Sequence, residues 1–190
     1  KSSVYFYWSQ QTLYVEVMTY AKYLEPVMSI VKECITKPAF PQNELDKTKA
    51  ESKTSLESQM NEPQSIVFVQ LAKHTESYSR DHIFYSATPK EQVEDQAGIT
   101  RDQVVDFYNN FVGGSDAFGV VVGDVDAARV KSVLQTTFGE WKSKVPFTRF
   151  LPAYSPSVKY DERINTPDKQ NGALACGLNI NLKRDNPDYP

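Results

Sequence analysis

Only two histidines, His74 and His82, could supply the imidazoles that most zinc enzymes use. A zinc peptidase helix carries two His at i and i+4, so that both reach one metal, and a Glu that activates water. Residues 74–78 read His-Thr-Glu-Ser-Tyr, which lacks that spacing. A weak site built from His74, Asp81 and His82 is the alternative. Histidines that face solvent or lie in a loop fit the sequence better.

Two aspartates, Asp124 and Asp126, follow an apolar run and could act as an acid–base pair. They also stand where a turn and a helix N-cap need short acidic side chains, and we favour that interpretation. The glycines at 113–114, 119 and 123 form neither Gly-x-Gly-x-x-Gly nor Gly-Lys-Ser/Thr, so no phosphate loop is predicted.

Cys34 lies on the apolar face of a helical pattern, and Cys176 lies in a strand-like run. Free cysteine behaves as a small hydrophobe, so we expect two buried thiols rather than a disulfide. The redox compartment stays open. The aromatic run 5–8 (Tyr-Phe-Tyr-Trp) is typical of sheet and core packing rather than of a base-stacking platform.

The bulk composition excludes some classes of partner. The net charge is −3 with no long run of one sign, which disfavours a nucleic-acid partner because phosphate binding needs a basic face. No apolar run approaches the ~20 residues of a membrane span. The chain begins without Met and shows no signal peptide. We therefore expect it to be part of a longer protein whose compartment the sequence leaves open.

Periodicity predicts the elements that must position any site. Aromatic and β-branched residues over 4–20 predict two strands around a polar turn. Apolar spacings of three and four, with Pro, Thr and Asp at helix starts, predict five helices in the first two thirds of the chain and one after the aspartates. The helical ranges are 22–37, 42–61, 63–77, from 88, from 100, and 127–138. Further strands are predicted at 116–123, covered on both faces, and at 169–183, with alternating apolar residues.

This order predicts an α+β fold, with an antiparallel-rich sheet and helices packed on one face. We expect two parts. Residues 1–114 are the C-terminal part of one α+β domain, a strand hairpin plus helices. Residues 115–190 are the N-terminal part of the next, homologous domain, in which the Pro-rich stretch 142–168 resembles a linker.

Several motifs occur in an order known from one peptidase family. They are Lys37-Pro38-Ala39-Phe40, Glu44-Leu45 with Lys49, Pro63, Tyr78 with His82, Thr88-Pro89, Ile99-Thr100-Arg101-Asp102-Gln103-Val104, Val121-Val122-Gly123-Asp124-Val125-Asp126, Phe138-Gly139-Glu140-Trp141, Thr166-Pro167-Asp168-Lys169 and Asn186-Pro187-Asp188-Tyr189-Pro190. Together they resemble the insulinase/pitrilysin-type zinc metallopeptidases, which include mitochondrial processing peptidase. The likeness spans nearly the whole chain and is greatest to the non-catalytic second half of bacterial two-half members.

The resemblance implies a clamshell of two homologous halves. One half carries His-x-x-Glu-His and a later Glu that bind zinc, and the other helps to enclose the peptide. The later Glu would fall about two turns before Pro63, where this chain has Ser55, with Glu57 slightly out of phase. Serine does not replace a carboxylate as a zinc ligand. A substrate-binding Arg and Tyr of the second half would follow Pro190. No catalytic, cofactor-binding or metal residue is therefore predicted in this chain.

The resulting expectation is a non-catalytic domain of a zinc endopeptidase. Its partners would be a peptide or protein substrate and the catalytic half of the same polypeptide, which would hold the zinc. Two alternatives stay open: a competent segment with Glu57 as third ligand, and an inactive structural or assembly subunit. Export to the periplasm is an expectation from the resemblance alone. Because the chain would begin and end inside domains, exposed sheet edges and self-association are also expected.

Overall fold

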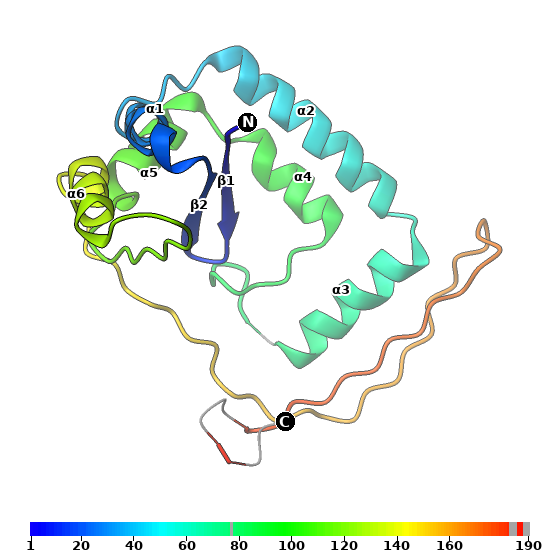
Figure 1. The fold of residues 1–190 in the computed structure, drawn as a ribbon. Helices are drawn as coiled ribbons and strands as arrows, with labels where there is room; N and C mark the ends of the chain where they lie inside the picture. Colours follow the sequence, from blue (N-terminus) through cyan, green and yellow to red (C-terminus); the bar gives the residue numbers. More distant parts are fainter. Residues whose placement is uncertain (77, 183–185, 188–190) are drawn as a thin grey trace. The chain divides into compact units, whose positions relative to one another are not determined.

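The computed structural model describes residues 1–76, 78–182 and 186–187, and these form an α+β fold (Figure 1). The described residues contain six α-helices and one two-stranded antiparallel sheet. The elements are β1 (Ser3–Ser9), β2 (Thr12–Met18), the 3-10 helix η1 (Ala21–Tyr23), α1 (Leu24–Thr36), α2 (Gln42–Gln59), α3 (Pro63–Thr75), α4 (Pro89–Ala97), α5 (Arg101–Phe111) and α6 (Ala127–Phe138). Both the predicted fold class and the order of the helices are confirmed.

Contacts divide the chain into two compact units. Unit 1 comprises Lys1–Pro41 and Thr100–Arg149, and unit 2 comprises Gln42–Ile99 and Phe150–Pro190. Each unit is therefore discontinuous in sequence. The boundary predicted at residue 114 concerns homologous domains, and it stays a prediction.

The core of unit 1 lies where α1 packs against α6. The buried residues Met28, Val31 and Ile35 follow one another at spacings of three and four, so that they share one face of α1. Val112, directly after α5, is also buried, and Tyr108 of α5 donates a hydrogen bond of 2.7 Å from its hydroxyl to the carbonyl oxygen of Ile35. These contacts hold α1, α5 and α6 of unit 1 together.

Two polar contacts fix α6. The Asp126 carboxylate accepts a 2.7 Å hydrogen bond from the backbone N–H of Arg129, so Asp126 is the N-cap that the sequence predicts. The Arg129 side chain donates to both carboxylate oxygens of Glu25, at the start of α1, over 2.5 Å each. The bidentate pair joins the N-terminal turns of α1 and α6.

The hairpin β1–β2 pairs Ser3 with Met18 through to Ser9 with Thr12, and Gln10 makes the turn with φ of 52°. In β2, burial alternates along the strand: Leu13, Val15 and Val17 are partly covered, and the residues between them are exposed. Tyr14 is one of the exposed residues, and its ring stacks on that of Tyr7, its partner in β1, at 5.0 Å. The alternation follows from the period of two in a strand, and it confirms the predicted hairpin.

Unit 2 is built on the packing of α2 against α4. Lys49 of α2 donates 2.9 Å hydrogen bonds to the carbonyl oxygens of Ala97 and Ile99, which stand at the end of α4. Such carbonyls have no partner within the helix, and a cation there also complements the helix dipole. Within the described residues, no helix is both long and apolar enough to cross a membrane.

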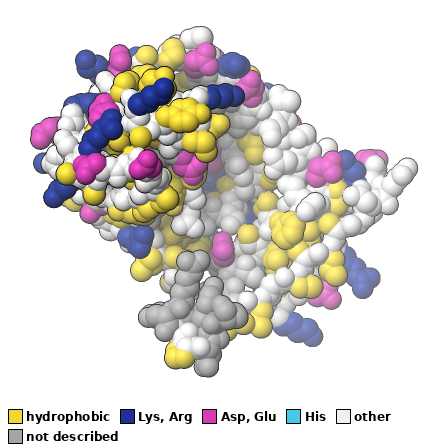
Figure 2. All heavy atoms as spheres, in the orientation of Figure 1, with side chains coloured by type: hydrophobic (Ala, Val, Ile, Leu, Met, Phe, Trp, Pro, Cys, Tyr) yellow, Lys and Arg dark blue, Asp and Glu magenta, His cyan; other side chains and the backbone are white. Residues whose placement is uncertain are grey.

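The two later strands that the sequence predicts are not formed. Residues 116–123 are in no strand, and Phe118, Val120 and Val122 are 86%, 80% and 93% exposed, so the expectation of cover on both faces is wrong. The described part of the predicted strand 169–183, residues 169–182, is likewise in no strand. A strand needs a hydrogen-bonded neighbour as well as an apolar pattern. Figure 2 shows apolar side chains reaching the surface among charged ones.

The two cysteines are free but exposed, which corrects the prediction of buried thiols. Cys34 lies between Val31 and Ile35 in the sequence, yet only Met28, Val31 and Ile35 of that helix are buried. Its thiol lies at the edge of the apolar stripe rather than at its centre. Cys176 belongs to the extended segment that forms no strand.

Candidate functional site

The helix that should carry the family's third zinc ligand is α2. Its partly covered stripe contains Leu45, Lys49, Ser52 and Leu56, whereas Ser55 and Glu57 are exposed. Ser55 and its neighbours line a shallow hollow, but all of the lining residues belong to α2 itself. A serine hydroxyl in an open hollow is a poor metal ligand.

The local contacts of Ser55 and Glu57 are those of an ordinary helix surface. The Ser55 hydroxyl accepts a 3.3 Å hydrogen bond from the Gln59 amide, one turn on. Glu57 forms an exposed ion pair of 3.8 Å with Lys53. No three His, Cys, Asp or Glu side chains come together as a possible metal site in the part of the chain that is described. These residues therefore do not fit a zinc centre.

Neither histidine joins a group of possible metal ligands among the described residues. His74, in α3, is half-buried: its ring stacks on Tyr160 at 4.1 Å and its Nε2 lies 2.8 Å from the Val158 carbonyl oxygen. His82 is exposed in the loop after α3, where it stacks on Tyr78 at 4.4 Å. His82 is the loop histidine that the sequence favours, whereas His74 is half-buried against Val158 and Tyr160.

A polar cluster that the sequence did not predict joins the end of α3 to the start of α4. The Glu91 carboxylate is its centre: it accepts from the Thr88 backbone N–H (2.6 Å), the Tyr85 hydroxyl (2.8 Å) and the Lys73 amino group (3.0 Å). Lys73 also donates to Tyr85 over 2.9 Å. We call Lys73, Tyr85, Thr88 and Glu91 the Glu91 cluster.

These contacts stabilise the charged forms of both ionic groups. Hydrogen bonds from the Thr88 backbone, and then from Tyr85 and Lys73, hold the pKa of Glu91 at about 2, below its ordinary value of 4.5. The Lys73 pKa is raised, first by its hydrogen bond with Tyr85 and then by Glu91. Both groups therefore stay ionised at neutral pH, with neither available as a proton acceptor or donor poised near pH 7.

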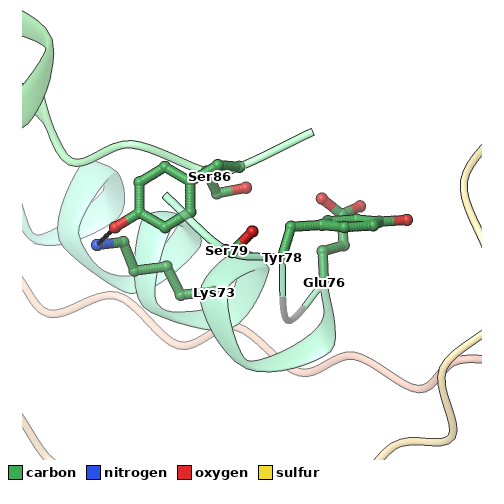
Figure 3. A pocket seen from close by; sticks show the side chains of 6 residues that line it. Lys73, Glu76, Tyr78, Ser79 and Ser86 are labelled. Carbon is green, nitrogen blue, oxygen red and sulfur yellow. Dashed lines mark hydrogen bonds between the residues drawn. The ribbon is translucent and has the colours of Figure 1, made fainter. Parts of the chain in front are cut away.

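Beside the Glu91 cluster is an open hollow of about 440 Å³ (Figure 3). Its lining residues are Lys73, Glu76, Tyr78, Ser79, Tyr85 and Ser86. Figure 3 shows the Lys73 amino group turned toward the tyrosine hydroxyl to which it donates, with Glu76 and Tyr78 on the other side of the hollow. Since Lys73 is held within the cluster, it anchors the loop between α3 and α4 and is not a free amine.

Two residues of this cluster, Thr88 and Glu91, did have a sequence signal. Thr88, Pro89 and Glu91 have the spacing of a capping box, and the structure forms it: Thr88 Oγ1 accepts from Glu91 N–H over 3.2 Å. The contribution of Lys73 had no signal, because it stands 18 residues before Glu91 and on another helix. Of the two aspartates that could act as an acid–base pair, Asp126 caps α6 and Asp124 is an exposed turn residue.

The chain is thus an α+β protein whose described residues form no metal centre. Residues 98–190 match the family model described as the peptidase M16 inactive domain. The match supports the resemblance to the insulinase/pitrilysin-type M16 peptidases that the motif order predicts, and in particular to their inactive C-terminal domain. The match includes α5, α6 and both exposed apolar segments, whereas α2 and the Glu91 cluster lie before it.

The other comparisons add no relative. No curated protein matches the chain, and neither does any solved structure.

Proposed function

We propose that this chain is a non-catalytic part of a zinc-dependent endopeptidase, in which it helps to enclose the peptide substrate. The observation that carries the proposal is the match of residues 98–190 to the M16 inactive domain. The surface of α2 supports it, because Ser55 stands where the resemblance expects a zinc-binding carboxylate and Glu57 is engaged by Lys53. Zinc and the catalytic half would come from elsewhere in the polypeptide.

The competent alternative requires Glu57 to turn away from Lys53 and to join two ligands outside this chain. The Lys53–Glu57 pair is exposed, so its loss has little effect on stability, and this alternative depends on ligands that the chain does not supply. The structural-subunit alternative differs in having no peptide contact. Peptide binding by the chain separates the enclosing role from the structural subunit. The competent alternative is tested by Glu57→Gln in the full-length protein, where unchanged zinc content and activity would exclude it.

The test uses the purified chain with a fluorescein-labelled unstructured peptide and an internally quenched version of it. Fluorescence anisotropy should report saturable peptide binding, and the quenched peptide should stay intact with or without micromolar zinc. Zinc-dependent cleavage that o-phenanthroline stops would overturn the non-catalytic assignment. Anisotropy that stays flat up to millimolar chain would overturn the enclosing role and leave the structural subunit.

A further inference from the structure

Asn171 and Gly172 form an Asn-Gly pair in unit 2, and the sequence contains no other such pair. The backbone nitrogen that follows an asparagine can attack the carbonyl carbon of its side chain and expel ammonia, which closes a five-membered succinimide ring. Glycine favours this reaction, because it has no side chain to shield its nitrogen and adopts the widest range of torsion angles. The pair therefore has the chemistry of deamidation, and the fold decides whether the reaction is allowed.

The structure leaves the pair open to this attack. Both residues are exposed and belong to no helix or strand, and a Cβ built on Gly172 meets no atom within 4 Å. Neither residue forms a hydrogen bond with any residue that the structure describes. The side chain of Asn171 and the N–H of Gly172 are therefore both available to react.

The chain is held on either side of the pair. The Lys169 backbone N–H donates to the Thr166 carbonyl oxygen over 3.0 Å, and the Lys169 amino group pairs with Glu62 at 2.5 Å. Further on, the Asn179 amide donates to carbonyl oxygens of two other segments of unit 2. These contacts anchor the segment in unit 2, and the stretch 170–173 lies between them with no hydrogen bond to restrain it among the described residues.

The other asparagines of the chain lack this combination. Three lie in helices, where the torsion angles hold the next nitrogen away from the side-chain carbon. These are Asn43 in α2, and Asn109 and Asn110 in α5. Asn186 precedes proline, which has no N–H to lose. The rest precede residues whose side chains shield the nitrogen and narrow its torsion angles. They are Asn61, Asn165, Asn179 and Asn181.

We propose that Asn171 is a site of spontaneous deamidation, through a succinimide that it forms with Gly172. The Gly172 nitrogen gives its proton to solvent and bonds to Asn171 Cγ. The Cγ–Nδ2 bond then breaks, and the side-chain nitrogen takes up a proton and leaves as ammonia. Water opens the ring at one of its two carbonyls, which yields aspartate or isoaspartate. Each event replaces a neutral amide with a carboxylate, so the net charge of −3 becomes more negative by one.

The isoaspartate product identifies a class of partner. It carries one extra backbone carbon at position 171, and isoaspartyl methyltransferases are the enzymes that recognise and repair this linkage. The pair lies outside α3, α4 and the Glu91 cluster, so the helices should persist after the change. The reaction is independent of the proposed peptidase role, since it needs neither zinc nor a substrate peptide.

Ageing the purified chain at pH 8 in heavy-oxygen water tests the proposal. Trypsin releases residues 170–183 as one peptide, in which Asn179 and Asn181 are internal controls. Tandem mass spectrometry should find solvent oxygen at position 171 and none at the two controls. Gly172→Ala should slow the reaction about tenfold or more, because a methyl group hinders the nitrogen. Asn181→Gln, in the same segment, should leave the rate unaltered, and circular dichroism should show equal helix content in all three proteins.

Two further measurements test the openness of the site and the succinimide route. The folded chain should react within about tenfold of the rate of the chain unfolded in guanidinium chloride, because an exposed site needs no opening. An isoaspartyl methyltransferase should radiolabel aged wild type and leave aged Asn171→Gln unlabelled. A folded rate below that range, equal reaction at Asn171 and Asn179, a Gly172→Ala rate equal to that of wild type, or deamidation without isoaspartate would overturn the proposal.

Discussion

Replacing Glu91 with Gln should loosen the connection between α3 and α4 without disturbing the rest of the chain. The carboxylate accepts three hydrogen bonds, from Thr88, Tyr85 and Lys73, at 2.6–3.0 Å. The amide oxygen of Gln can still accept from Thr88 and Lys73, which share one carboxylate oxygen of Glu91, so the bond from Tyr85 and the negative charge opposite Lys73 are lost. At this partly buried site each loss costs about 1 kcal/mol. We expect unit 2 to lose about 2 kcal/mol.

Hydrogen exchange measured by mass spectrometry resolves this effect locally. A loss of about 2 kcal/mol corresponds to roughly 30-fold faster exchange through local opening for backbone amides of α4. Both tryptophans, Trp8 and Trp141, lie in unit 1, so tryptophan fluorescence serves as an internal control that should not change. Glu94→Gln, an exposed neighbour on the same helix, is the matched substitution and should leave α4 exchange unaltered.

The pH dependence follows from the depressed pKa of Glu91. A carboxyl whose pKa falls from 4.5 to about 2 on folding stabilises the protein above 4.5, and this contribution is lost as pH falls toward 2. The difference between wild type and Glu91→Gln should therefore shrink across that window. Equal exchange rates in the two proteins at pH 7, or a difference that grows as the pH falls, would refute the reasoning.

Three further substitutions probe unit 1 by urea unfolding followed by tryptophan fluorescence. Ile35→Ala should cost about 2–5 kcal/mol, because Ile35 is 2% exposed and a cavity remains; a cost below 1 kcal/mol would contradict its place in the core. Asp126→Ala should cost about 1 kcal/mol through loss of the α6 cap, whereas Asp124→Ala should be neutral; equal effects would argue against the capping role. Arg129→Ala should lower stability slightly at low salt and not in 1 M NaCl, because the pair with Glu25 is exposed and screened; a salt-independent loss would point to packing instead.

The helices were predictable because their signals are local. Thr88 and Thr100 each stand three residues before a Glu or Gln, and both form the capping boxes that define the starts of α4 and α5. The N-cap of α6 was likewise readable from Asp126. Every predicted helix begins within about two residues of its predicted start, and the predicted helices 22–37, 42–61 and 127–138 also end within about two residues of their predicted ends. α3 ends at Thr75, and position 77 of the predicted helix 63–77 lies outside the described residues.

The failures share a non-local cause. The residues around Val120 and Leu178 have strand patterns, but a strand forms only with a partner, and the pattern does not say where the partner lies. The prediction that Cys34 is buried fails because periodicity gives the direction of an apolar stripe on a helix but not the width of the stripe. The Glu91 cluster depends on a contact between Lys73 and Glu91 across two helices, which no local motif encodes.

The central claim is that this chain does not itself form the zinc centre of an M16 peptidase. Equilibrium dialysis of the chelator-treated chain against micromolar zinc, with the metal measured by mass spectrometry, tests it most directly. Glu57→Gln and Glu51→Gln, two members of similar i, i+4 pairs on α2, serve as variant and control. We predict much less than one zinc per chain in all three proteins. One tightly held zinc per wild-type chain that Glu57→Gln removes and Glu51→Gln retains would contradict the account.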